Sequence, residues 1–76
     1  MKIQQTVSPS PVEALTALIR ALVTYEQRHD MPSIDFYDRY QKGELADTAD
    51  FVEWAGDYLH YLQLKEQLEH KLAATG

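Results

Sequence analysis

The sequence contains no cysteine and only three glycines among its 76 residues. Without cysteine, the chain has neither a disulfide nor a thiolate ligand for a metal. The glycines are too scattered along the chain to form a phosphate-binding loop. There is also no apolar run of about 18 residues, and no basic segment followed by an apolar stretch after Met1. We therefore expect a cytoplasmic protein that has no membrane span.

Basic residues are also scarce, with seven Lys and Arg against twelve Asp and Glu and a net charge of -5. The imbalance is concentrated in the middle of the chain, where eight acidic residues between Asp30 and Asp57 meet only Arg39 and Lys42. Such a field repels phosphate backbones and attracts basic protein surfaces. The charge therefore favours a basic protein partner over DNA.

The chain is short enough to form only one domain, which would bury roughly 60% of the surface that the unfolded chain exposes. Domains of this size usually gain stability from disulfides, a bound metal or a partner subunit. Because disulfides are excluded, we expect a partner, either a second copy or another protein. We divide the chain into a tail or short strand at residues 1–9 and a single helical domain at residues 10–76.

The apolar pattern predicts an all-α fold of three helices, at about residues 11–29, 34–42 and 48–73. Ser10, Pro11 and Glu13 form a capping box with proline at the first helical position, which marks the start of the first helix. Pro32 cannot continue that helix.

The second predicted helix is short and ends at Gly43, which accepts a left-handed cap conformation without strain. Asp47 or Thr48 is expected to cap the third helix. Phe36, Tyr40 and Phe51 are expected to hold the second helix on the third.

The third predicted helix carries an apolar stripe along its whole length, aromatic in its first half and aliphatic in its second. About 25 residues give a rod of about 38 Å, which the first helix is too short to cover. Tryptophan and tyrosine are frequent anchors of protein interfaces, and acidic residues near them would face a basic partner. The predicted partner-binding residues are Asp47, Asp50, Glu53, Trp54, Asp57, Tyr58, Tyr61, Leu64, Leu68 and Leu72.

No pattern of residues indicates an enzyme. Asp57 and His60 lie one helical turn apart, as in metal-binding helical bundles, but such sites need a second pair on a facing helix. We therefore expect no catalytic residue, no cofactor and no metal.

Two neighbouring segments give the sequence a distinctive pattern, DFYDRYQKGELAD at residues 35–47 and DFVEWAGDY at residues 50–58. The pattern resembles a group of short bacterial and archaeal proteins that are encoded beside a toxin, although Ala46 stands where that group usually has a second glycine. The resemblance implies an antitoxin of a type II toxin-antitoxin pair. Such a protein holds its toxin, commonly a ribonuclease or a nucleotidyltransferase, in an inactive complex.

Two alternatives remain open at the level of sequence. A ribbon-helix-helix-like dimeric repressor would read DNA with residues 2–7, although that segment has only one basic residue, Lys2. DNA binding is therefore the less favoured interpretation. The second alternative is a helical homo-oligomer, such as a homodimer, with a structural or adaptor role.

Overall fold

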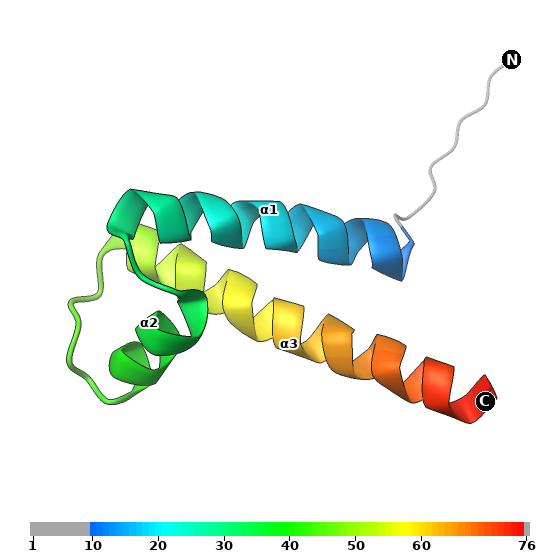
Figure 1. Cartoon of the computed structure of the whole chain (residues 1–76). Coiled ribbons are helices and arrows are strands. Elements are labelled where there is room, and N and C mark those ends of the chain that lie inside the picture. Colours follow the sequence, from blue (N-terminus) through cyan, green and yellow to red (C-terminus); the bar gives the residue numbers. More distant parts are fainter. Residues whose placement is uncertain (1–9, 76) are drawn as a thin grey trace, which may run out of the picture.

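The computed structural model describes residues 10–75, which form α1 (Pro11–His29), α2 (Ser33–Gln41) and α3 (Ala49–Thr75). α1 and α3 run antiparallel, and α2 packs on them near the end of the pair where the connecting segments lie (Figure 1). The predicted all-α arrangement of three helices is confirmed, with each boundary within two residues of its predicted position. The tail or strand predicted for residues 1–9 lies outside the described residues.

α1 begins and ends through local contacts. The Ser10 hydroxyl accepts a hydrogen bond from the Glu13 backbone N–H at 3.1 Å, and the Glu13 carboxylate accepts one from the Ser10 N–H at 3.4 Å. At the other end, Asp30 adopts a left-handed conformation with φ of 52°. Aspartate tolerates this conformation better than most residues do. The chain therefore turns at Asp30, two residues before the proline that had indicated the end of the helix.

The segment between α2 and α3 is a turn with two specific contacts. Gly43 follows the end of α2 with φ of 75°, as its predicted role requires. The Thr48 hydroxyl accepts a hydrogen bond from the Phe51 N–H at 3.1 Å and so caps α3. Asp47 instead accepts a hydrogen bond from the Tyr40 hydroxyl at 2.7 Å, which ties the turn to α2.

The core is centred on Trp54, whose side chain has no exposed surface. Phe36 of α2 stacks on it with ring centroids 3.8 Å apart. Tyr25 and His29 of α1 stack against it at 5.6 and 5.4 Å. A single side chain of α3 is therefore in contact with both other helices.

Ser33, the first residue of α2, links the same three helices through hydrogen bonds. Its hydroxyl accepts a bond from the Trp54 indole N–H at 2.9 Å. Its backbone N–H donates to the Glu26 carboxylate of α1 at 2.8 Å. Because Ser33 is only 3% exposed, a buried donor would lose its partner if this hydroxyl were removed.

The rest of the core lies around Trp54 and includes the other predicted core aromatics. Phe36 is fully buried, and Tyr40 and Phe51 pack against the buried cluster. Farther along α3 the covering is thinner, because α2 has only nine residues and α1 is eight residues shorter than α3. Among the described residues, no helix has both the length and the apolar character needed to span a bilayer.

An ionic cluster joins the end of α1 to the start of α3. Asp50 contacts Arg28 at 2.8 Å and His29 at 2.7 Å. The hydrogen bonds from His29 and then from Arg28 lower the pKa of the Asp50 carboxyl from its ordinary value. The charged form of Asp50 is therefore favoured by folding.

We predict that Ser33→Ala destabilises the protein by about 1 to 3 kcal/mol, because the Trp54 N–H is left buried without a partner. Trp54→Phe removes that donor, so the double variant should be more stable than the sum of the two single losses implies, by about 0.5 to 3 kcal/mol. Urea unfolding of the four proteins measures this coupling. Strictly additive losses would show that the hydrogen bond contributes nothing.

We also predict that acid weakens the fold through Asp50. Because the pKa of Asp50 is lowered in the folded state, its contribution to the free energy of unfolding is complete above the ordinary aspartate pKa of about 3.9. The contribution is lost as the pH falls through the lower folded value. Asp50→Asn should therefore flatten the decline of unfolding free energy measured between about pH 7 and about pH 3.

The matched control for this experiment is Asp38→Asn, which breaks an exposed pair with Lys42. Exposed pairs contribute little to stability, so this variant should keep the decline seen in the wild type. If Asp50→Asn and the wild type lose stability in parallel, the Asp50 cluster is not the acid-sensitive contact.

Candidate partner-binding groove

A groove of about 330 Å³ lies between α1 and the start of α2, where it also meets α3. All three helices contribute to its lining, which is mainly apolar. We call this feature the groove and define it by its residues: Ile19, Leu22, Val23, Glu26, Pro32, Ser33, Ile34, Tyr58 and Tyr61.

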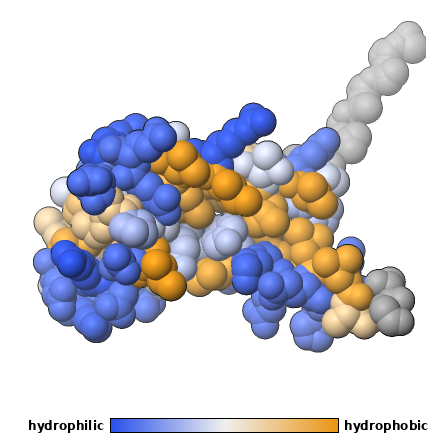
Figure 2. Space-filling model, viewed as in Figure 1, coloured by the Kyte–Doolittle hydropathy of each residue, from blue (hydrophilic) through white to orange (hydrophobic). Residues whose placement is uncertain are grey.

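The walls of the groove are exposed apolar side chains. Ile34 of α2 is 66% exposed, and Ile19 and Val23 of α1 are 43% and 42% exposed. Figure 2 shows apolar surface gathered along α1 and continuing over α3. Single exposed apolar residues are normal on soluble proteins, whereas a contiguous patch often marks an interaction site.

The groove follows from the width of the apolar stripe on α1. Leu22 lies at the inner edge of the stripe and is buried in the core. Ile19, Val23 and Glu26 lie at helical spacing and share the face of α1 next to Leu22. α2 packs against the core through Phe36 and Tyr40, which leaves Ile34 beside that face. The short α2 therefore makes one wall of the groove and does not cover it.

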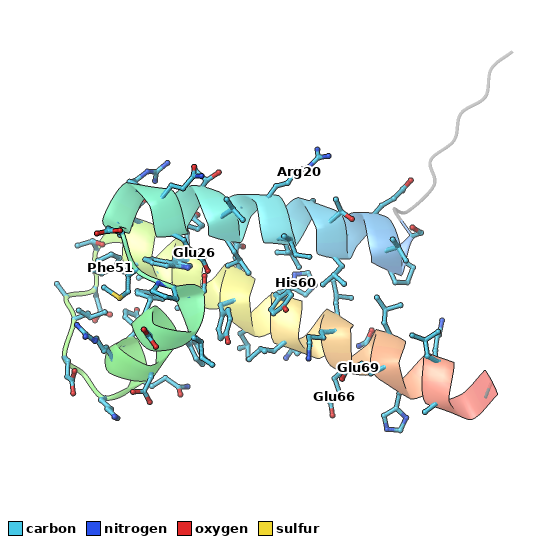
Figure 3. The ribbon with its side chains drawn as sticks, viewed as in Figure 1. Arg20, Glu26, Phe51, His60, Glu66 and Glu69 are labelled. Atoms are coloured by element: carbon cyan, nitrogen blue, oxygen red, sulfur yellow. The ribbon has the colours of Figure 1, made fainter. Side chains whose placement is uncertain are left out.

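The acidic group of the groove is Glu26, which points from α1 toward the start of α2 (Figure 3). The pKa of Tyr58 is raised, chiefly by burial. Electrostatic interactions with Tyr61 and then with Glu26 raise it further. Lys65 acts on Tyr58 in the opposite direction, but its ammonium group is bound to Glu69 at 3.1 Å. The groove thus combines apolar walls with a carboxylate whose charge acts on Tyr58.

The three predicted aromatic anchors have different environments. Trp54 has no exposed surface and is a core residue of the chain, and that it contacts a partner stays a prediction. Its indole is held inside the chain by Ser33 and by the rings stacked on it. Tyr58 is 9% exposed and Tyr61 is half-buried, and both line the groove.

Most of the predicted acidic residues form hydrogen bonds or ion pairs within the chain. The four predicted residues are Asp47, Asp50, Glu53 and Asp57. Asp50 is held by the cluster at the end of α1, and Glu53 accepts a 3.4 Å hydrogen bond from Tyr25. Burial, and then the charges of Asp57 and Glu53, raise the pKa of Tyr25. The α1 side chains that Asp50 and Glu53 contact therefore lie on a different face of the helix from the side chains that line the groove.

The predicted aliphatic residues lie on the second half of α3. Leu64 and Leu68 are half-buried within the chain, whereas Leu72 is 72% exposed. None of the three lines the groove. That they contact another chain stays a prediction.

Sequence reasoning missed the walls of the groove. Ile19 and Val23 widen the apolar stripe of α1 beyond what one packed helix can cover. This width could have indicated that part of the stripe stays exposed. Ile34 had no comparable signal, because its position beside α1 depends on the turn at Asp30.

Within residues 10–75, no three His, Asp or Glu side chains gather in a way that could hold a metal ion. Comparison of the sequence and the fold with protein-family models, curated proteins and solved structures gives no match. The groove and the sequence pattern of residues 35–58 are therefore the features that bear on function.

We predict that Ile34→Gln changes the unfolding free energy by no more than about 0.5 kcal/mol, because this side chain packs little within the chain. Leu22→Ala, on the buried edge of the same groove, should cost about 2 to 5 kcal/mol. Urea unfolding measures both values. Equal losses would show that Ile34 belongs to the core and that the groove has no exposed wall.

Proposed function

We propose that the protein is a binding module that acts as an antitoxin, neutralising a cognate toxin by direct complex formation. The observation that carries the proposal is the groove, in which exposed apolar side chains of two helices flank two tyrosines of the third. Interfaces gain most of their energy from a few apolar and aromatic contacts at a desolvated centre. The groove offers surface of this kind.

The lining of the groove favours binding over catalysis. Its single carboxylate, Glu26, already accepts a hydrogen bond from Ser33, and the neighbouring side chains are aliphatic or tyrosine. Side chains of this kind provide area and shape for a partner surface. We therefore propose no reaction at this site.

The antitoxin role is supported by the resemblance of residues 35–58 to small proteins encoded beside toxins. This segment contains most of α2, the turn and the start of α3, and so includes Phe36, Trp54 and Tyr58. A toxin that acts on RNA or nucleotides presents basic surface, which a chain of net charge -5 attracts at long range. A target of that kind would place the complex in the cytoplasm.

The two alternatives have weaker support. The DNA-binding alternative depends on residues 2–7, which lie outside the described part of the chain, and the net charge opposes it. A homo-oligomer would use apolar surface of the same kind as a foreign partner would. We therefore treat self-association as an outcome to be measured.

The test is co-expression of this protein with the product of the adjacent gene. We expect that product to arrest growth when expressed alone, and growth to recover when both proteins are present. A tag on either protein should recover both in a fixed ratio, measured by size-exclusion chromatography with light scattering. A neighbour that is harmless alone, or one whose toxicity is unchanged, would overturn the proposal.

A further inference from the structure

We propose that the groove receives a segment of the partner protein in which apolar side chains stand beside a lysine or arginine. The apolar side chains would pack on Ile19, Val23 and Ile34, and the cation would pair with Glu26 and Asp30. This inference rests on the proposed function and names the surface and the chemistry through which it operates.

The shape of the groove suits the edge of a protein better than a small molecule. Sites for small molecules usually enclose most of the ligand surface. Here the walls are open, because Ile19, Val23 and Ile34 keep 43%, 42% and 66% of their surface exposed. A side chain that projects from a partner surface can enter such a groove from the open side while the partner covers the walls.

The charge at the margin of the groove is negative. Glu26 lies in the lining, and Asp30 is the exposed C-cap residue of α1, whose backbone N–H donates to the Glu26 carbonyl oxygen. Glu26 uses one oxygen to bind the Ser33 N–H, and a carboxylate can accept further hydrogen bonds. It can therefore hold the start of α2 and a partner cation at the same time.

Three cations of the described residues are engaged with other carboxylates or point elsewhere. Lys42 is bound to Asp38 at 3.0 Å, and Lys65 is bound to Glu69 at 3.1 Å. Arg20 extends from α1 on the side away from α3 (Figure 3). A partner cation would therefore meet the Glu26 carboxylate in the groove and the Asp30 carboxylate at the end of α1, and a partner carboxylate would be repelled.

The same charges argue against a second copy as the occupant. A second copy would bring its own Glu26 and Asp30 to the contact if the two grooves faced each other, and it carries the same net charge of -5. Placing like charges together across an interface is costly. A basic partner removes this cost and gains attraction, so charge complementarity favours a foreign chain.

The first experiment measures binding of the adjacent-gene product to a groove variant, Val23→Gln/Ile34→Gln. The matched control is Val52→Gln/Leu59→Gln, which replaces two α3 side chains outside the groove that are 51% and 44% exposed. We expect affinity to fall about 30-fold or more for the groove variant, as for loss of interface anchors. The control should stay within about threefold of the wild type. Circular dichroism and thermal unfolding confirm that both variants fold.

The second experiment tests the charge. Glu26→Gln/Asp30→Asn removes two charges but keeps an acceptor oxygen at each position, and asparagine tolerates the left-handed backbone of residue 30. The control, Glu44→Gln/Glu66→Gln, gives the same net charge at exposed sites outside the groove. We expect the association rate at low salt to fall about tenfold for the groove pair and much less for the control.

The outcomes separate this inference from the proposed function. If the wild type forms no complex, both fail. If the complex forms but the groove and control variants bind equally well, the function stands and the groove inference fails. If the wild type alone is a dimer that the groove variant dissociates, the occupant is a second copy, and the inference of a basic foreign partner is overturned.

Discussion

The burial of Trp54 is the contact on which the rest of the structure depends. Its ring lies against Phe36 of α2 and against Tyr25 and His29 of α1, so one side chain links three helices. An indole N–H needs a partner when it is buried. Ser33 provides that partner, and the requirement fixes where α2 begins relative to α3.

The position of α2 in turn creates the groove. Once Phe36 is stacked on Trp54, the nine-residue helix has too little length to cover the remaining apolar face of α1. Ser33 and Ile34 at its start come to lie beside that face, and the bond from Ser33 to Glu26 fixes the distance between the two walls. The uncovered surface is thus a direct result of how the core is packed.

Local features of the fold were predictable from the sequence, and long-range placements were not. The Ser10 cap, the Gly43 turn and the helix boundaries depend on residues a few positions apart, so their patterns are readable. Trp54 was predicted as an interface residue and lies in the core. Its burial was not predictable, because spacing along one helix cannot tell which aromatic side chain packs against the two other helices. Tyr61 lies on the same stripe of α3, packs against the core and lines the groove, and that it contacts a partner stays a prediction.

The acidic composition illustrates the same limit for charge. The acid-rich middle of the chain indicated a basic partner, yet Asp50 and Glu53 bind groups of α1 within the chain. Glu26, which lies in the groove, belongs to a segment whose charges nearly balance. The net charge therefore describes the long-range field, whereas individual contacts decide which carboxylates face the groove.

Because Ser33 and Trp54 hold the groove in shape before any partner arrives, little ordering would be needed on binding, and a small surface can then provide useful affinity.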